Sequence, residues 1–163
     1  MVLLESMSER EFQKFFSASS SAYARANVES GRWVKEGAEQ RAIHQLKDLL
    51  PDGINTPDRW VFNITVQASR ETAGYLFFAA VEQGGLRSGY IYDFEILPAF
   101  RRRGFAQAAL CELERFANSL DLPFIDLHVF GSNAGAQALY DRQGYFVEGV
   151  QMRKMVSETP PGE

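Results

Sequence analysis

The sequence predicts a single mixed α/β domain, in which a central, mostly antiparallel sheet is flanked by helices. Three observations support this fold class. The 163 residues are 45% hydrophobic, which is enough for one substantial core. Three consecutive strand-like segments with short connections, between residues 60 and 97, are typical of an antiparallel meander. A strand–helix–strand order follows them, and this crossover makes the sheet mixed.

The first fifty residues predict a short edge strand and two helices. Val2–Leu4 is a brief apolar run. Ser8 and Glu11 then form a capping box, and apolar residues at helical spacing continue to a stop at Gly31. A second amphipathic stretch follows Trp33 and ends at residues 51–53, Pro-Asp-Gly.

The period then changes to that of strands. Residues 60–66, 71–81 and 89–97 are the three strands of the meander. We expect a helix from Gly104 to Leu120, a strand at 124–130 and a helix from Asn133 to Gln143. The segment 145–156 is strand-like and is interpreted as one long strand or a tight hairpin. Residues 1–156 would form the domain, and 157–163 a flexible tail.

Charge and composition exclude several classes of protein. With 17 basic and 21 acidic residues, the chain lacks the positive field of a nucleic-acid-binding protein. No apolar run approaches the roughly 20 residues that cross a bilayer, so no membrane partner is expected. Cys111 is the single cysteine, which indicates a reducing, cytoplasmic location. Two distant histidines and one cysteine provide no metal site, and no G-x-S-x-G serine hydrolase motif occurs.

The segment RRRGFA, residues 101–106, lies between a strand and a helix. The first backbone N–H groups of a helix lack partners and carry partial positive charge, so such an end can bind phosphate. Gly104 and Ala106 leave room for a bulky anion, and the arginines add charge-assisted hydrogen bonds. An arginine-rich turn can equally be solvated surface. Neither glycine-rich nucleotide-binding motif is present.

Two segments together resemble the GNAT superfamily of acetyl-CoA-dependent N-acetyltransferases. ILPAFRRRGFA is similar to its acyl-CoA-binding pattern [Q/R]-x-x-G-x-[G/A], matched by Arg101, Gly104 and Ala106. LHVFGSNAGAQALYDRQGYF is similar to the later family segment, and the resemblance covers roughly residues 60–156. It implies a GNAT-like domain, monomeric or homodimeric, that transfers an acetyl group from acetyl-CoA to a primary amine of a small molecule or peptide. A non-catalytic acyl-CoA-binding module is the alternative.

The resemblance also implies roles for individual residues. Ile96 would offer backbone groups to the pantetheine arm, and Asn133 would reach the same region while also serving as a helix N-cap. Tyr140 would be the general acid that protonates the departing thiolate; alternatively it is a half-buried aromatic. The pyrophosphate would be held by the loop and helix start at Arg101, Arg102, Arg103, Gly104, Phe105 and Ala106.

The identity of the base stays open at this level. Strand alternation predicts that Asp93 and Glu95 share one face, whereas Tyr92, Phe94 and Ile96 share the other. Glu95 ranks first as the base because it lies nearer the cofactor end, and Asp93, His128 or a water chain are the alternatives. Acidic residues of the N-terminal region, Asp48, Asp52 and Asp58, favour a cationic acceptor.

Overall fold

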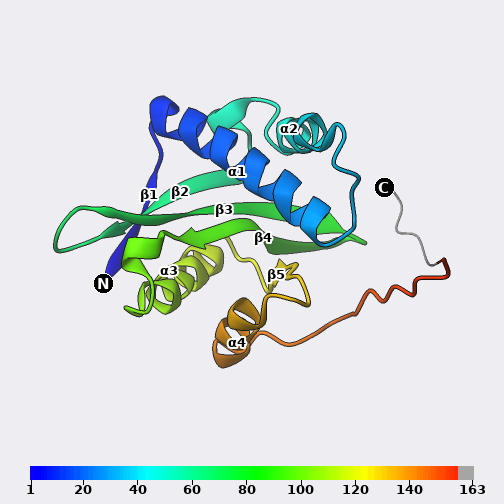
Figure 1. Ribbon diagram of the computed structural model, residues 1–163. Coiled ribbons are helices and arrows are strands. Elements are labelled where there is room, and N and C mark those ends of the chain that lie inside the picture. Colours follow the sequence, from blue (N-terminus) through cyan, green and yellow to red (C-terminus); the bar gives the residue numbers. More distant parts are fainter. Residues whose placement is uncertain (158–163) are drawn as a thin grey trace.

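The computed structural model describes residues 1–157, whose strands form one sheet in the order β1-β2-β3-β4-β5 (Figure 1). The first four strands are antiparallel neighbours, and β5 runs parallel to β4. The predicted mixed, mostly antiparallel sheet is therefore confirmed. The strands are β1 (Val2–Ser6), β2 (Arg59–Val66), β3 (Thr72–Gln83), β4 (Leu86–Ile96) and β5 (Ile125–Leu127).

Helices α1 (Glu9–Glu29) and α2 (Ala38–Leu49) cover one face of the sheet (Figure 1). The predicted capping box is present: Ser8 N–H donates to Glu11 Oε2 at 2.8 Å, and Glu11 N–H donates to Ser8 Oγ at 3.3 Å. A short 3₁₀ turn, η1 (Gly53–Asn55), follows α2. The apolar residues between these helices and the sheet are Met7, Phe12, Phe15, Leu46, Leu50, Val61 and Phe77.

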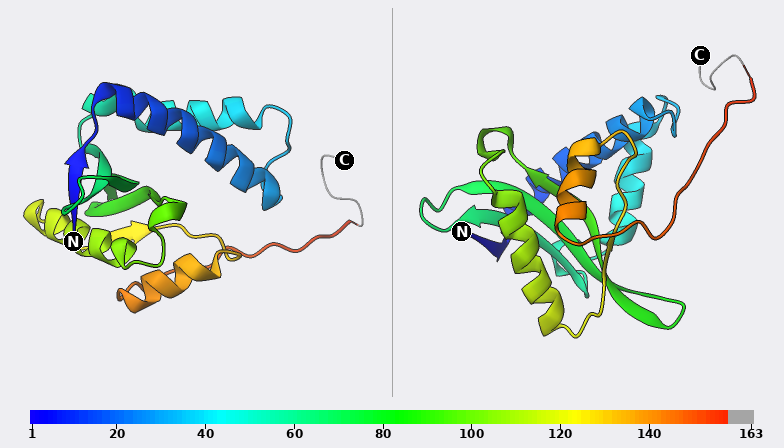
Figure 2. Two further views of the ribbon diagram at one scale, coloured as in Figure 1. Left: turned by 60° about the vertical axis from the view of Figure 1, so that its left-hand side comes forward. Right: turned by 90° about the horizontal axis from the view of Figure 1, so that it is seen from below.

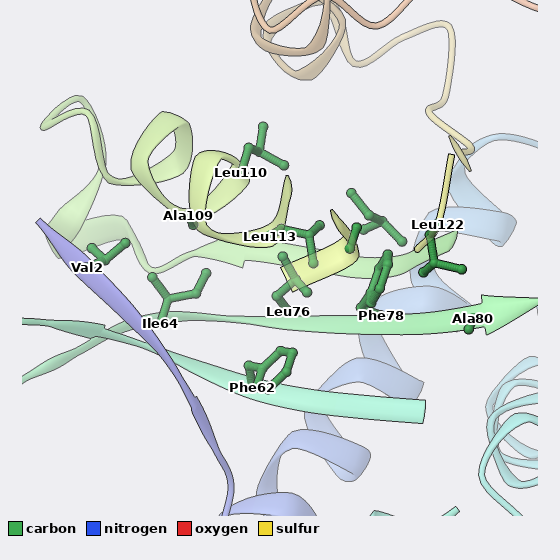
Figure 3. Close-up of a cluster of buried hydrophobic side chains, with 12 residues drawn as sticks. Val2, Phe62, Ile64, Leu76, Phe78, Ala80, Ala109, Leu110, Leu113 and Leu122 are labelled. Carbon is green, nitrogen blue, oxygen red and sulfur yellow. The ribbon is translucent and has the colours of Figure 1, made fainter. Parts of the chain in front are cut away.

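The opposite face is covered by α3 (Phe105–Ser119), which follows the 3₁₀ turn η2 (Pro98–Phe100), and α4 (Ala134–Arg142) lies beyond it (Figure 2). The larger core lies between α3 and the sheet (Figure 3). Alternate residues of β3 supply it, because successive side chains of a strand point to opposite faces. Its members include Ile64, Leu76, Phe78, Leu110 and Leu113.

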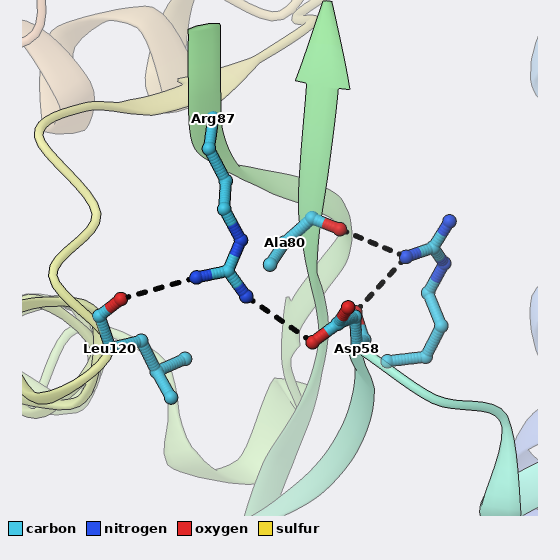
Figure 4. Close-up of polar contacts among 5 residues, drawn as sticks. Asp58, Ala80, Arg87 and Leu120 are labelled. Carbon is cyan, nitrogen blue, oxygen red and sulfur yellow. Dashed lines mark hydrogen bonds and ion pairs between the residues drawn. The ribbon is translucent and has the colours of Figure 1, made fainter.

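Arg87 joins the start of β4 to the end of α3 (Figure 4). Its guanidinium donates to the Leu120 carbonyl at 3.4 Å and to Asp58 Oδ1 at 3.3 Å. Asp58, one of the acidic residues offered as a clue to the acceptor, is therefore half of an ion pair. The Arg59 guanidinium at the start of β2 donates to the Ala80 carbonyl of β3 at 3.0 Å, which adds a side-chain link between these two strands.

Two expectations for the C-terminal third are wrong. The strand expected at 124–130 is limited to Ile125–Leu127, because the chain leaves the sheet after this residue. Residues 145–156 form neither a strand nor a hairpin; they run out from the end of α4 (Figures 1 and 2). Of the tail expected at 157–163, all but Ser157 lies outside the described residues, so the domain boundary stays a prediction.

Among residues 1–157, no helix is both long and apolar enough to cross a membrane.

Candidate active site

A cleft opens where β4 and β5 separate. The two strands pair only over Gly89–Ile91 and Ile125–Leu127, and beyond these residues a cavity of about 170 Å³ lies between them. The end of β4, the loop after β5 and the inner side of α4 form its walls. The lining residues are Ile91, Tyr92, Asp93, Phe94, Leu127, His128, Val129, Phe130, Asn133, Ala136 and Tyr140.

A β-bulge in β4 shapes this cleft. Phe77 of β3 is opposite Asp93 and Phe78 is opposite Ile91, so Tyr92 is an extra residue in the ladder. A bulge bends its strand and interrupts pairing, which coincides with the end of the β5 ladder at Ile91. The Tyr92 ring lies 5.0 Å from the Phe77 ring, on the face covered by α1. Tyr92 therefore lies on the α1 face, and the prediction that it shares the other face with Phe94 and Ile96 is wrong.

Asp93 is held between the sheet and α1. The buried Ser19 hydroxyl of α1 donates a short hydrogen bond to its Oδ2. Burial raises the pKa of Asp93 to about 6, against the hydrogen bond from Ser19, which lowers it. A carboxylate with this pKa is ionised at neutral pH, yet it is a stronger base than an exposed aspartate.

Tyr140 reaches the same cleft from α4. Burial raises the pKa of its hydroxyl to about 12, and the negative charge of Asp93 adds to this effect. Asp93 and Tyr140 both line this cleft, from β4 and α4 respectively. The Tyr140 ring also packs against the Tyr145 ring, with centroids 5.4 Å apart. The hydroxyl stays protonated at neutral pH and is available as a donor.

Glu95 shares the α1 face with Asp93, as predicted, but it is not among the residues that line the cleft. The Tyr75 hydroxyl donates to Glu95 Oε2, and Arg101 lies 3.3 Å from Glu95 Oε1. Burial and the charges of Asp93 and Glu95 raise the pKa of Tyr75, so its hydroxyl remains a donor. Glu95 therefore connects β3 to the arginine loop.

The arginine loop precedes α3, as the sequence indicates. Gly104 is the N-cap in a left-handed conformation with φ of 79°, and it offers no side-chain hydrogen bond to the first amides. A Cβ added to Gly104 would meet no atom within 4 Å, so the space beside the helix start is open. The start of α3, from Phe105 and Ala106 onward, can therefore accept an anion.

The three arginines of this loop have different surroundings. Arg101 Nε donates to the Ile96 carbonyl at 2.8 Å, so the Ile96 oxygen, expected to be free, already has a partner. Arg103 lies over the rings of Phe100 and Phe105, at 5.7 and 5.0 Å. Arg102 is exposed.

His128 and Asn133 line the cleft with Asp93 and Tyr140. His128 is exposed, and its ring meets the Phe130 ring edge-on with centroids 5.3 Å apart. Asn133 is the expected N-cap: its Oδ1 accepts the Ala136 N–H at 3.1 Å. The cleft therefore brings together His128, Asn133, Tyr140 and Asp93, whereas Glu95 and Ile96 lie at the arginine loop.

Sequence reasoning missed Ser19, Tyr75 and the orientation of Tyr92. Ser19 lies in the run SASSSA, where no residue type marks the serine that donates to Asp93. Within residues 1–157, no group of three His, Cys, Asp or Glu residues could hold a metal ion.

Comparison with known proteins gives a consistent result. Residues 13–145 match the model of the acetyltransferase (GNAT) family. Two Bacillus subtilis proteins described as uncharacterised N-acetyltransferases are similar over 94% of this chain and 97% of their own: YdgE at 33% identity and YycN at 29%. The crystal structure of YycN superposes with a TM-score of 0.90, covering 97% of this chain and all of that one. The catalytic subunit NAA20 of the Arabidopsis thaliana N-terminal acetyltransferase B complex is 26% identical over 61% of this chain and 66% of its own.

Proposed function

The chain belongs to the GNAT family of acetyltransferases and is an N-acetyltransferase, and we propose that it transfers an acetyl group from acetyl-CoA to a primary amine in the cleft beside β4. One observation carries the proposal. Asp93 and Tyr140 face this cleft from β4 and α4, with a pKa of about 6 and about 12 respectively. One group can accept a proton and the other can donate one at neutral pH.

The start of α3 fits the anionic part of acetyl-CoA. The unpartnered amides, the open space beside Gly104 and the charges of Arg101, Arg102 and Arg103 would together bind a pyrophosphate. The Ile96 carbonyl accepts one hydrogen bond from Arg101 and has a second lone pair for another donor, so we expect pantetheine contacts there, at Asn133 and along the open edge of β4. Acetyl-CoA, when bound, supplies an acetyl group activated as a thioester.

Asp93 is the proposed base. Its carboxylate would accept the proton that an ammonium group must lose before the amine can attack, and Ser19 would hold the carboxylate in position. The Tyr140 hydroxyl would donate a proton to the departing sulfur. His128 also lines the cleft and is the alternative base, whereas Glu95 would act indirectly, by positioning Tyr75 and Arg101.

The surface beside Asp93 favours a cationic acceptor. The rings of Tyr90 and Tyr92 lie 4.7 Å apart. Burial raises the pKa of Tyr90, and the charges of Tyr92, Asp126 and Tyr23 add smaller contributions in the same direction. The side chains of Tyr23 and Tyr92 are partly exposed, at 45% and 36%. Aromatic faces next to a carboxylate attract ammonium groups. Polyamines, amino sugars and peptide N-termini are therefore the acceptors to test; NAA20, by its description, belongs to an N-terminal acetyltransferase complex.

The experiment combines calorimetric titration of acetyl-CoA with an assay of CoA release from a panel of amines. We expect binding, with turnover fastest for cationic acceptors. Asp93→Asn should remove most turnover and spare binding, and Glu82→Gln, which neutralises an exposed carboxylate near the end of β3, is the matched control. Absence of binding at millimolar acetyl-CoA would contradict the proposal. Binding without turnover of any amine would favour the non-catalytic module, and a normal rate in Asp93→Asn would exclude Asp93 as the base.

A further inference from the structure

The turn that ends α4 involves Tyr140 itself. Gly144 has a left-handed backbone with φ of 84°. Its N–H donates to the Asp141 carbonyl at 3.0 Å, and the N–H of Tyr145 donates to the Tyr140 carbonyl at 3.0 Å. These two hydrogen bonds define a Schellman motif, in which a left-handed residue closes the end of a helix. The backbone of this turn therefore binds the carbonyl of Tyr140.

The same turn brings two tyrosine rings together. In a Schellman motif, the residue after the left-handed position commonly makes an apolar contact with the residue whose carbonyl it binds. Here these two residues are Tyr145 and Tyr140, and their ring centroids lie 5.4 Å apart at an interplanar angle of 60°. Aromatic pairs favour this edge-on geometry. Tyr145 therefore contacts Tyr140 twice, at the carbonyl and at the ring.

Helix α4 is attached to the rest of the fold through partly buried residues. None of its nine residues is fully buried. Leu139 and Tyr140 pack against the larger core, and Cys111 Sγ of α3 lies 3.9 Å from Gln143 Oε1 at the end of the helix. A general acid must lie within hydrogen-bond reach of the atom that it protonates, and an error of about 1 Å in position can lower a rate about 100-fold. A contact that fixes the Tyr140 ring should therefore affect turnover.

The ring of Tyr145, and not its hydroxyl, makes this contact. The hydroxyl oxygen is buried and has no hydrogen-bond partner among residues 1–157. Burial also raises the pKa of Tyr145, so the hydroxyl stays protonated at neutral pH. Leaving a buried hydroxyl without a partner costs free energy, so the hydroxyl does not stabilise the turn.

We propose that Tyr145 is a positioning residue for acetyl transfer, whose ring holds the Tyr140 hydroxyl where it can protonate the departing sulfur. The inference rests on the proposed function, because it takes Tyr140 as the acid. In that step the bond between the sulfur and the acetyl carbon breaks, the Tyr140 proton moves to the sulfur, and water later returns a proton to Tyr140. Tyr145 does not line the cleft, so it acts through Tyr140.

The test compares wild type, Tyr145→Leu, Tyr140→Phe and the double variant in the assay of CoA release. Tyr145→Leu removes the aromatic contact but keeps an apolar side chain. It should lower kcat about 10- to 100-fold and leave the calorimetric affinity for acetyl-CoA unchanged. The same substitution should have no further effect in the Tyr140→Phe chain, because that chain has no hydroxyl to position. A general loss of structure would lower kcat equally in both backgrounds.

Matched variants separate the ring, the hydroxyl and the backbone. Tyr145→Phe keeps the ring and should retain the wild-type kcat. Gly144→Asn should keep the turn, whereas Gly144→Val is strained at a φ of 84° and should lower kcat as Tyr145→Leu does. A Cβ on Gly144 would meet no atom within 4 Å, so the difference between these two variants reports the backbone. Phe124→Leu, at an exposed aromatic residue before β5, should leave kcat unchanged.

The pKa of Tyr140 provides a readout that does not depend on turnover. Burial raises this pKa to about 12, against 10.0 for an ordinary tyrosine. In an NMR titration of chains labelled with ¹³C at the tyrosine ζ carbon, the wild-type Tyr140 signal should change little up to about pH 11. In Tyr145→Leu it should titrate closer to the ordinary value, because water reaches the ring. The Tyr140→Phe chain identifies the signal by its loss.

Several results would overturn the proposal while the proposed function stands. They are a wild-type kcat in Tyr145→Leu, equal losses in the two backgrounds, and an unchanged pKa of Tyr140. A lower kcat in Tyr145→Phe would assign the effect to the hydroxyl instead of the ring. If Tyr145→Leu does not fold, the two Gly144 variants make the same comparison. Full activity of Tyr140→Phe would contradict the acid assigned in the proposed function, and the positioning role with it.

Discussion

Replacing Asp93 by Asn should stabilise the fold while removing activity. The folded chain holds Asp93 with a pKa of about 6, against an ordinary value of 3.8 for aspartate, because burial disfavours the ionised carboxylate. Each pKa unit corresponds to about 1.4 kcal/mol, so the ionised Asp93 lowers the free energy of unfolding by at most about 3 kcal/mol. Asp93 is partly accessible, and screening by water reduces this figure to about 1–2 kcal/mol.

The size of the effect depends on pH. Below about pH 4, Asp93 is protonated in both the folded and the unfolded chain, and the substitution should change little. Between pH 4 and 6 the unfolded chain ionises first, so wild-type stability falls as pH rises, and above 6 the difference is constant. Asn cannot ionise, and its amide oxygen can still accept the Ser19 hydroxyl. The gain should therefore appear only above about pH 4.

Thermal unfolding of wild-type and Asp93→Asn chains at pH 4 and pH 7.5 measures this difference. For a domain of this size, about 1–2 kcal/mol corresponds to an increase in Tm of about 2–8 °C at pH 7.5. Asp48→Asn, which removes one negative charge from the exposed side of α2, controls for the change in net charge. Equal or lower stability of Asp93→Asn at pH 7.5, or the same gain at both pH values, would refute the burial argument.

Three further substitutions test other parts of the molecule. Tyr140→Phe should lower kcat by roughly 10²–10⁴, the usual range for an acid–base step, and leave acetyl-CoA affinity unchanged in calorimetry; full activity would remove Tyr140 from the mechanism. Gly104→Glu adds bulk, negative charge and an unfavourable φ at the start of α3, so acetyl-CoA binding should be lost, and unaltered binding would exclude this helix start as the anion site. Gly89→Ala would put a Cβ 2.4 Å from the fully buried Phe78 ring and should cost about 1–3 kcal/mol in urea unfolding, whereas wild-type stability would mean that the ring can move.

Much of the fold follows from local sequence signals. The capping box at Ser8 and Glu11 starts α1, the glycine at 104 starts α3, and Asn133 caps α4, because each feature acts within one turn of backbone. The predicted stop at Gly31 agrees with the end of α1 at Glu29. Short-range hydrogen bonding decides these boundaries, so they can be predicted without knowledge of tertiary contacts.

Features that depend on pairing between distant segments could not be predicted in the same way. The sequence indicates strand character at 145–156, but the existence of a strand also requires a neighbour, and none is present in the described residues. The same reason shortens β5, since only Ile125–Leu127 lie alongside β4. Strand propensity is a local property, whereas the hydrogen bonds of a sheet are formed by residues far apart in the chain.

The sequence by itself determined the order of the helices and strands as far as α4, the position of RRRGFA at a helix start, and the presence of two carboxylates near the end of one strand. Only the tertiary structure decided that these two carboxylates have different neighbours and different roles. The bulge at Tyr92 and the contact with Ser19 of α1 put Asp93 at the cleft, while Tyr75 and Arg101 bind Glu95. Alternation along a strand assigns both residues to one face, but the solvation of each carboxylate, and therefore its basicity, is set by what packs against it from elsewhere in the chain.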